Sequence, residues 1–327
     1  MTVLCRLIAA ALEVSVSPVN TSFHSATATI MQRNLKLPKK SAQCGLGFFL
    51  PFLGDCAGAS DGFLNPAGPV AAALRDHFVF IVLVMTIVIV PLFVALPWAL
   101  WRYRIGNKHA NYQPEWEFSW SLEILVWGLS TVIVCVLGWQ LYRQSYALDP
   151  YKPLLATQQP LEVQVVGLDW KWLFVYPEQS IASANELVLV AGRPVSLRLT
   201  SNTVMQSFII PRLGGQIYTM AGMVTRLNLM ASEPGEYRGE NTQYNGMGFA
   251  NQKFQARAVS QTDFDAWTTS LRQSKPPLDD AAWGLLVQPS VLPAPRLFGR
   301  VPQGFFARVV ASFTGGHRHL QTNGAEQ

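Results

Sequence analysis

Two long stretches without charged side chains constrain this chain more than any other feature. The first, Phe78 to Trp101, contains no charged residue. As a helix it would rise about 36 Å, which exceeds the roughly 30 Å hydrocarbon thickness of a bilayer. The second, Phe118 to Tyr142, carries a charge only at Glu123. Each stretch is predicted to span a membrane, so transmembrane helices are expected at residues 78–101 and 118–142, paired as a hairpin.

The connecting loop at residues 102–117 sets the predicted orientation of the hairpin. It begins with Arg102 and Arg104, continues to Lys108, and is bordered by several tryptophans. Positively charged loops stay on the cytoplasmic side of a membrane, and tryptophans gather at its interfaces. We therefore expect this loop in the cytoplasm and both termini outside it.

The first 55 residues are interpreted as an upstream segment followed by a signal peptide. From Met31 a basic start precedes a short apolar run that begins at Cys44, which is the order of a secretory signal. Met1 and Met31 both remain open as the true start. Leu53-Gly54-Asp55-Cys56 resembles the cleavage site of bacterial lipoproteins, so Cys56 is expected to carry lipid. The alternative is an ordinary thiol after an ordinary cleavage site, and residues 56–77 are in either case an exported N-terminal segment.

Residues 158–260 change from continuous apolar runs to an alternation of apolar and polar residues. Clear examples begin at Leu161, Val195 and Phe254. The alternation slips at Val166-Gly167 before it resumes, which predicts a bulge. Several short alternating strands separated by turn residues are typical of a β-sandwich or barrel of about a hundred residues.

Residues 261–327 form a predicted helical tail. Phe264, Trp267 and Leu271 share one face of an amphipathic segment, with Thr262 as the expected N-cap. Prolines divide the rest of the tail into short pieces. Two or three small helices are therefore expected over the sandwich or along the membrane surface, the last of them near residues 304–313.

Charges and donor atoms exclude some classes of function. The formal net charge is only +5 and the basic residues are scattered, so no nucleic-acid partner is expected. From Gln158 to Ser260 the chain has neither cysteine nor histidine, whereas copper electron-transfer sites need thiolate or imidazole donors. Methionine sulfur could hold Cu(I), but methionine is more often a flexible packing residue. The five methionines of this region are Met205, Met220, Met223, Met230 and Met247.

The order of a signal, two spans and an exported sandwich resembles subunit II of the haem-copper respiratory oxidases, from about Cys56 to Trp267. For members oxidised by cytochrome c, that resemblance implies a cupredoxin sandwich with a binuclear copper centre. Its ligands are a histidine on one strand and the side chains of one loop. Here the loop at residues 239–252, GENTQYNGMGFANQ, keeps the length and the glycines but replaces the ligands. The ligand positions are occupied by Gln206, Asn241, Gln243, Asn245, Phe249 and Gln252.

Three further segments resemble subunit II of the cytochrome bo-type ubiquinol oxidases: LDWKWLFVYPEQ, SFIIPRLGGQIYTMAGM and RLNLMASEPGEYRG, which begin at Leu168, Ser207 and Arg226. This implies a proton-translocating enzyme of the bacterial inner membrane that oxidises ubiquinol and reduces dioxygen to water. Its partners would be subunits I, III and IV and membrane lipid, with the sandwich in the periplasm. The haems, copper and ubiquinol site would belong to subunit I, leaving no cofactor in this chain. The haem types and the choice of ubiquinol or menaquinol stay open, and the alternative is a stand-alone membrane-anchored binding module.

Glu123 is the candidate catalytic residue. Considered alone, an acid within a predicted span either marks a proton pathway or reaches the headgroup layer at the helix end. The resemblance favours proton entry, because the segment from Leu122 to Trp127 matches the family's cytoplasmic mouth of a proton-uptake channel. A proline expected shortly after Trp127 is replaced by Gly128-Leu129-Ser130, which leaves the local helix bend open.

The loop at residues 239–252 is expected to hold nothing small. Its asparagines, glutamines and glycines are predicted to preserve the turn by hydrogen bonding to the loop's own backbone. Its outer face would rest on subunit I. Trp170 and Trp172, which lie outside this loop, are predicted to serve as core and docking surface.

Overall fold

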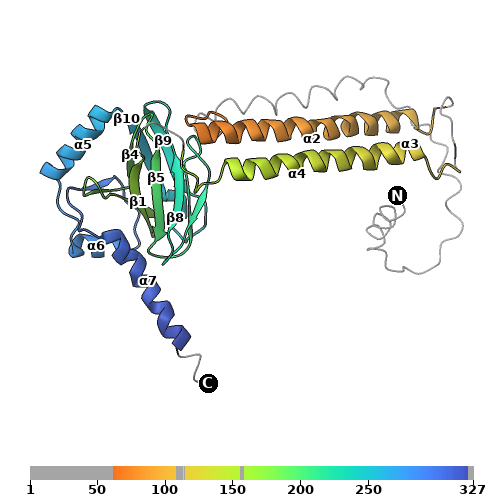
Figure 1. The fold of residues 1–327 in the computed structure, drawn as a ribbon. Coiled ribbons are helices and arrows are strands. Elements are labelled where there is room, and N and C mark those ends of the chain that lie inside the picture. The colour runs from red at the N-terminus through yellow and green to blue at the C-terminus, as the bar shows by residue number, and fades with distance from the viewer. Residues whose placement is uncertain (1–61, 108–112, 114, 155–157, 323–327) are drawn as a thin grey trace, which may run out of the picture. The chain divides into compact units, whose positions relative to one another are not determined.

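The structure is a computed structural model that describes residues 62–107, 113, 115–154 and 158–322, with side chains as far as residue 313 (Figure 1). The upstream segment and signal peptide predicted at residues 1–55 lie outside the described residues. The same holds for the lipidation predicted at Cys56 and for part of the loop at residues 102–117.

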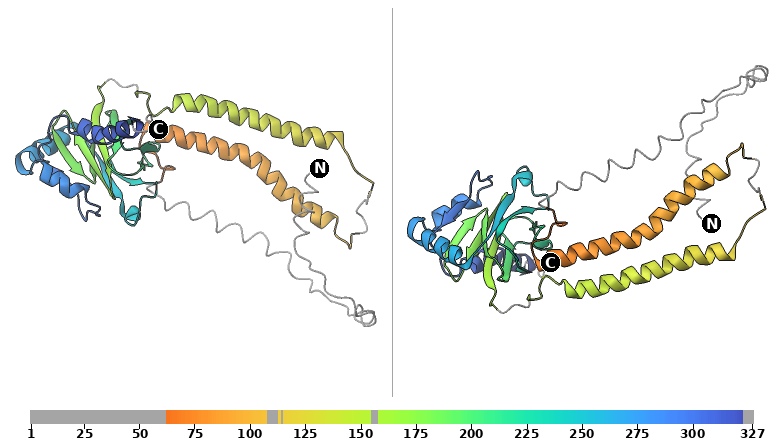
Figure 2. Two further views of the ribbon diagram at one scale, coloured as in Figure 1. Left: turned by 90° about the horizontal axis from the view of Figure 1, so that it is seen from below. Right: turned by 90° about the horizontal axis from the view of Figure 1, so that it is seen from above.

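Two long apolar helices run side by side as a hairpin (Figures 1 and 2). Helix α2, Pro69–Arg102, begins before the predicted span, because proline at the first position after Gly68 suits a helix start. It continues without interruption through Pro91 and Pro97. By length and composition, both helices of the hairpin can cross a membrane.

The second membrane helix is built from three pieces. These are α3 (Trp120–Glu123), the π-helical turn η3 (Ile124–Gly128) and α4 (Leu129–Ala147). The helix therefore continues beyond its predicted end at residue 142. Large apolar side chains along the hairpin are exposed; those of Leu83 and Trp139, for example, are 61% and 65% exposed. Such a surface is stable only when lipid or other protein chains cover it.

Two β-sheets form the sandwich that follows the hairpin. A six-stranded sheet has the order β11-β3-β2-β1-β5-β8, and a five-stranded sheet has the order β4-β10-β9-β6-β7. β1 pairs in parallel with β5 and β4 with β10, whereas the other pairings are antiparallel. The strands are β1 (Leu161–Leu168), β2 (Lys171–Tyr176), β3 (Ile181–Ala184), β4 (Glu186–Val190), β5 (Val195–Ser201), β6 (Gln206–Ile209), β7 (Ile217–Thr219), β8 (Thr225–Leu229), β9 (Gly235–Asn241), β10 (Lys253–Val259) and β11 (Arg296–Phe298).

Aromatic rings fill the space between the two sheets. Trp172 of β2 meets Phe208 of β6 edge to face at 5.3 Å between ring centroids, and Phe208 stacks on Phe254 of β10 at 5.0 Å. All three side chains are buried. Trp172 is thus a core residue, as predicted, and it ties the six-stranded sheet to the five-stranded one.

β1 contains no bulge at Val166-Gly167, so that prediction is wrong. Each of its residues from Gln164 to Leu168 pairs in register with β2, and the pairing with β5 is equally regular. The apparent slip arises because both faces of β1 are buried at this end. Val165 faces the core between the sheets, whereas Val166 and Leu168 belong to a second apolar cluster beneath the C-terminal tail.

The tail completes that second apolar cluster by covering the sheet, and it adds a strand to the same sheet. Helix α5 (Gln261–Ser274) is capped by Ser260, whose hydroxyl accepts from the N–H of Asp263, so the predicted cap at Thr262 is wrong. Helix α6 (Asp280–Val287) and strand β11 follow, and β11 extends the six-stranded sheet by pairing with β3. Helix α7 (Phe305–Thr322) is longer than predicted.

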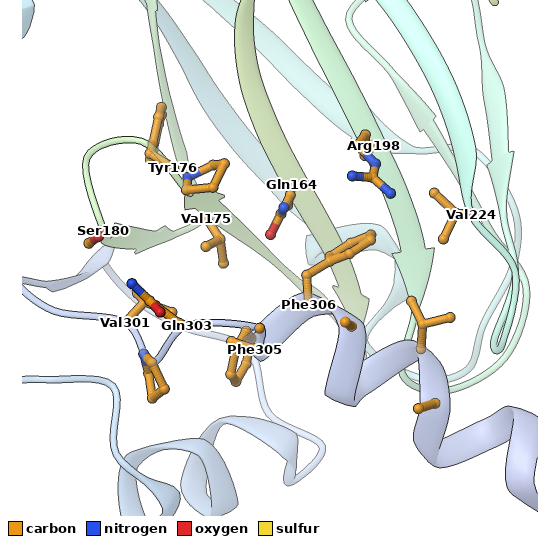
Figure 3. A pocket seen from close by; sticks show the side chains of 16 residues that line it. Gln164, Val175, Tyr176, Ser180, Arg198, Val224, Val301, Gln303, Phe305 and Phe306 are labelled. Atoms are coloured by element: carbon orange, nitrogen blue, oxygen red, sulfur yellow. The ribbon is translucent and has the colours of Figure 1, made fainter.

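Helix α7 leaves a cavity of about 450 Å³ against the outer face of β1, β2 and β5 (Figure 3). Gln164 and Arg198 point toward it from the sheet, and Phe306 of α7 lies between them. The guanidinium of Arg198 pairs with Glu162 at 3.4 Å and lies over the Phe306 ring at 5.8 Å. Arg198 is the charged residue of the lining, and the carboxylate of Glu162 pairs with its guanidinium.

Candidate functional site

Four amide side chains meet at one end of the sandwich, and all four occupy predicted copper-ligand positions. Gln206 opens β6, Asn241 ends β9, Gln252 directly precedes β10, and Asn245 lies in the loop between β9 and β10. Register pairs the end of β9 with β6 and with the start of β10, which brings these positions together. We call these four side chains the amide cluster.

Gln252 is the centre of the amide cluster. Its Nε2 donates to Oε1 of Gln206 at 2.7 Å. Its Oε1 accepts from Nδ2 of Asn245 at 2.7 Å and from Nδ2 of Asn241 at 3.0 Å. Gln206 in turn donates from Nε2 to the carbonyl of Leu168 at 3.0 Å. The cluster therefore binds three segments of the sandwich to one another.

Backbone groups complete the hydrogen bonding of Asn241. Its Oδ1 accepts from the backbone N–H of Ser207 at 2.9 Å and from that of Gln243 at 3.0 Å. Its Nδ2 also donates to the carbonyl of Gln243 at 2.8 Å. The prediction that this loop bonds to its own backbone is therefore right for Asn241, and the cluster adds bonds between side chains that the sequence did not indicate.

Burial makes these hydrogen bonds necessary. Gln206 and Gln252 are 0% exposed and Asn241 is 4% exposed. A buried amide without a partner costs roughly 1–3 kcal/mol, whereas a bonded one contributes about 1 kcal/mol net. Each member thus depends on the others. The Oδ1 of Asn245 is the exception, since it is buried and receives no hydrogen bond from the described residues.

The donor atoms of the amide cluster do not suit a copper electron-transfer centre. Such centres use thiolate and imidazole, and the cluster offers only neutral carboxamides whose atoms are largely engaged with one another. Within the described part of the chain, no three side chains of His, Cys, Asp or Glu lie close enough to hold a metal ion.

The other two ligand positions stay outside the cluster. Gln243 contributes its backbone N–H and carbonyl to Asn241, and its side chain forms no hydrogen bond with the residues that the structure describes. Phe249 lies in the short 3₁₀ turn η4 (Phe249–Asn251), and its ring packs against that of Tyr244 with 5.7 Å between the ring centroids. Four of the six predicted ligand positions are therefore joined by side-chain hydrogen bonds, and Gln243 and Phe249 are not part of that cluster.

Glu123 ends the first turn of the second membrane helix. Its Oε2 accepts a hydrogen bond from the indole Nε1 of Trp127 at 2.9 Å. The π-helical turn η3 begins at the next residue and ends at Gly128, the first of the three residues where a proline bend was left open; Leu129 and Ser130 are α-helical. Thr131 then donates to the carbonyl of Trp127 at 2.8 Å. Single π turns inside α-helices occur frequently at functional sites.

Comparison with known proteins identifies the family. The sequence is 41% identical over 271 residues to subunit 2 of the cytochrome bo(3) ubiquinol oxidase of Pseudomonas putida, which covers 82% of this chain and 86% of that protein. It is 42% identical over 262 residues to ubiquinol oxidase subunit 2 of Acetobacter aceti, covering 80% and 85%. The chain belongs to the ubiquinol oxidase subunit II family. It is thus a subunit of a respiratory oxidase complex, as the sequence predicted.

Two other comparisons add little to this assignment. No protein-family model matches the sequence. Among solved structures, the periplasmic domain of subunit II of the cytochrome oxidase of Bradyrhizobium japonicum is 18% identical with a TM-score of 0.35, over 36% of this chain and 98% of that domain. Membership in the ubiquinol oxidase subunit II family rests on the sequence matches.

Trp170 supports the loop of this ubiquinol oxidase subunit II in a way that the sequence did not indicate. It has a left-handed backbone (φ 64°) in the turn between β1 and β2, and its Nε1 donates to the carbonyl of Asn245 at 3.2 Å. Gly248 lies against its ring so closely that an added Cβ would be 2.2 Å from Cδ2 of Trp170. The alternating pattern had placed Trp170 within a strand.

Lys171 is a second residue whose role was missed. Its side chain is buried, and its Nζ donates to the carbonyl of Gln288 at 2.7 Å and to the carbonyl and hydroxyl of Ser290 at 3.1 and 2.7 Å. Burial lowers the pKa of Lys171, whereas the nearby carboxylate of Asp169 opposes this shift. In this ubiquinol oxidase subunit II, Lys171 therefore fastens the tail to the six-stranded sheet.

Proposed function

We propose that this chain is a non-redox subunit II of a proton-translocating ubiquinol oxidase, which braces the complex and admits protons at Glu123. Ubiquinol would give its electrons to haems and copper in subunit I, and none would pass through this chain. The sandwich and both termini would lie in the periplasm. The reaction class is supported by the relatives, which are subunits of ubiquinol oxidases, and the separation of roles between subunits is supported by the residues described above.

The amide cluster is the observation that carries the non-redox part of the proposal. Its hydrogen bonds fill the place where copper-binding relatives would need thiolates and imidazoles. A carboxamide is not redox-active, and it has neither the thiolate nor the imidazole that copper would need as a ligand. The cluster instead holds β6, β9 and the start of β10 in a fixed arrangement, which suits a bracing role.

Glu123 is suited to proton collection by its position and its free acceptor sites. It lies in the first turn after the basic loop at residues 102–117, which is the side proposed to be cytoplasmic. A carboxylate offers about four lone-pair sites. Among the described residues Trp127 donates to one of them, which leaves the others for water or for subunit I. The indole would keep the carboxylate in one orientation while protons are exchanged.

Exposed apolar side chains support assembly with other subunits. They cover the hairpin on all sides, which suits contact with subunits I, III and IV and with membrane lipid. Loops of the sandwich also expose apolar side chains, including Tyr244 at 71% and Met247 at 94% beside the amide cluster. This loop surface is proposed to rest on subunit I. A lipid on Cys56 would add an anchor at the N-terminus, and mass spectrometry of the mature N-terminus tests it.

Proton entry is tested with Glu123→Gln in the assembled complex. The variant should lower ubiquinol-driven oxygen consumption and proton ejection from reconstituted vesicles by at least about tenfold, since a general acid–base group typically contributes 10²–10⁴-fold. Glu117→Gln is the matched control, because Glu117 is exposed in the same loop region. Unchanged turnover and pumping in Glu123→Gln would return this residue to the headgroup alternative.

Purification in mild detergent tests the bracing role. Haem-bearing polytopic partners should accompany the chain, and the copper content of the complex should be the same for wild type and for Asn241→Ala. Loss of copper from the variant would contradict a metal-free sandwich. Recovery of a colourless monomer would favour the stand-alone binding module.

A further inference from the structure

A cavity of about 400 Å³ lies where the hairpin meets the sandwich. Its walls come from the start of α2, the end of α4, the segment at residues 149–154, and the sandwich around Gly215 and β8. The lining is mostly apolar and includes Val70, Leu74 and Leu227. Its volume falls within the range of about 300–1,000 Å³ that is usual for small-molecule sites.

Hydrogen bonds fix one wall of this cavity. After α4 the chain passes along the edge of β8, where Asn228 donates from its backbone N–H to the carbonyl of Pro150 at 3.1 Å. The side-chain Nδ2 of Asn228 donates to the same carbonyl at 3.0 Å and to that of Lys152 at 3.2 Å. The segment that leaves the second membrane helix is thereby held on the sandwich.

A second set of contacts fixes the wall formed by α2. The N–H of Ala67 donates to the carbonyl of Arg212 at 2.7 Å, and the N–H of Ser232 donates to the carbonyl of Ala67 at 2.8 Å. Gly68 is so close to the sandwich that an added Cβ would be 2.2 Å from the carbonyl oxygen of Met230. Both ends of the hairpin are thus fastened, so the cavity is a preformed feature of the fold.

The location of the cavity indicates its ligand. Helix α2 begins and helix α4 ends at its walls, so the cavity lies at the same end of both membrane helices, on the side where they would leave the bilayer and lipid would be available. Lys152 is exposed at its edge, and no ion pair of its ammonium is seen among the described residues. The one acid of the lining, Asp149, accepts the backbone N–H of Tyr151 at 2.9 Å. Basic side chains at membrane surfaces attract anionic headgroups.

We propose that this cavity binds one anionic phospholipid of the adjacent leaflet. One acyl chain lies between Leu74 and Leu227, and the headgroup phosphate pairs with the ammonium of Lys152. The bound lipid fills the apolar space between the hairpin and the sandwich. This site is independent of the proton role of Glu123 and of the state of the amide cluster.

Photo-cross-linking of the purified complex tests the site. The probe is phosphatidylglycerol with a diazirine near the end of one acyl chain, and cross-linked peptides are mapped by mass spectrometry. Label is expected on residues 147–154 and 215–228 of the wild-type chain. Gly215→Leu should remove at least about nine-tenths of this label, because an added Cβ at Gly215 points toward Leu74 at 3.7 Å without a clash and a longer side chain occupies the cavity.

Matched controls separate the lipid from general effects. Gly284→Leu introduces the same side chain on α6, where nothing lies within 4 Å of the added Cβ, and should keep the label. Lys152→Gln should reduce the preference for phosphatidylglycerol over phosphatidylcholine about fivefold, and Lys253→Gln on β10 should not. If Gly215→Leu fails to assemble, Leu74→Trp fills the same space.

Two outcomes would overturn the proposal. Label confined to the middle of the membrane helices, or equal label in wild type and Gly215→Leu, would show that no acyl chain enters the cavity. Equal labelling of the wild type by phosphatidylglycerol and phosphatidylcholine would remove the anionic headgroup from the assignment.

Discussion

Gln252 and Gln206 lie 46 positions apart in the chain, and their side chains share a 2.7 Å hydrogen bond from Nε2 to Oε1 in the interior of the sandwich. Both are 0% exposed. The bond joins the loop after β9 to the start of β6. Neither amide has access to water, so each side chain is oriented by the other and by its remaining partners.

Gln252→Ala is expected to destabilise the sandwich, because it removes the acceptor of Asn241 and Asn245 and the donor to Gln206 together. Buried groups left without partners cost about 1–3 kcal/mol, so the melting temperature of the purified complex should fall. Gln243→Ala is the control, since the Gln243 side chain forms no hydrogen bond within the described part of the chain. Equal melting temperatures for Gln252→Ala and wild type would show that the cluster does not stabilise the fold.

Gly248→Ala is expected to displace Trp170. The added Cβ would lie 2.2 Å from Cδ2 of the Trp170 ring, and overpacking of this kind costs about 1–3 kcal/mol. Melting of the complex and the fluorescence of its tryptophans provide the measurement. Gly284→Ala meets no neighbour and should be neutral or slightly stabilising in its helix. A Gly248→Ala complex as stable as wild type would mean that the loop is not held against Trp170.

Trp127→Phe is expected to lower proton ejection less than Glu123→Gln does. The variant retains the carboxylate but removes its hydrogen-bond donor. A hydrogen bond worth about 0.5–1.5 kcal/mol corresponds to roughly a two- to tenfold loss of rate. The same vesicle assay measures both variants. Trp139→Phe, on an exposed face of α4, is the control, and a normal rate in Trp127→Phe would exclude a positioning role for the indole.

Lys171→Met is expected to loosen the tail. The substitution removes the Lys171 donor from the carbonyls of Gln288 and Ser290, and the Gln288 carbonyl keeps only the hydroxyl of Ser290 at 3.3 Å among the described residues, so the free energy of unfolding should fall by about 1–3 kcal/mol. Faster amide hydrogen exchange of β11 and α6 would report the change locally. Exchange as slow as in wild type would show that Lys171 does not fasten the tail.

The difference in the free energy of unfolding between wild type and Lys171→Met should depend on pH, and linkage fixes the sign of that dependence. Burial lowers the pKa of Lys171 below its ordinary value of 10.5, so between these two values the unfolded chain binds more protons than the folded one. Linkage then requires wild type to gain stability relative to Lys171→Met as the pH rises through that window. Denaturation of both proteins across the window measures it. A difference that falls with pH would contradict a lowered pKa.

The hairpin and the sandwich could be predicted because each follows from a local pattern. Uninterrupted apolar residues indicate membrane helices whatever their partners, and alternation indicates strands with one buried face. The bulge expected at Val166-Gly167 failed because β1 is buried on both faces there, which depends on a tail more than a hundred residues later. A local sequence pattern does not show that a distant part of the chain will cover the second face of a strand.

The replaced ligand positions could be found from the sequence, but their arrangement could not. Residue types showed that Gln206, Asn241 and Gln252 cannot bind copper as cysteine or histidine would. Their mutual hydrogen bonds depend on register between strands distant in sequence. Trp170 was misplaced because a left-handed tryptophan in a turn contradicts the usual preference for glycine or asparagine. The role of Lys171 required knowing that the tail returns to β2.

The amide cluster has one more consequence. Carboxamides carry no net charge and exchange no electrons, so the hydrogen bonds that close this end of the sandwich involve no side chain that titrates or changes its oxidation state.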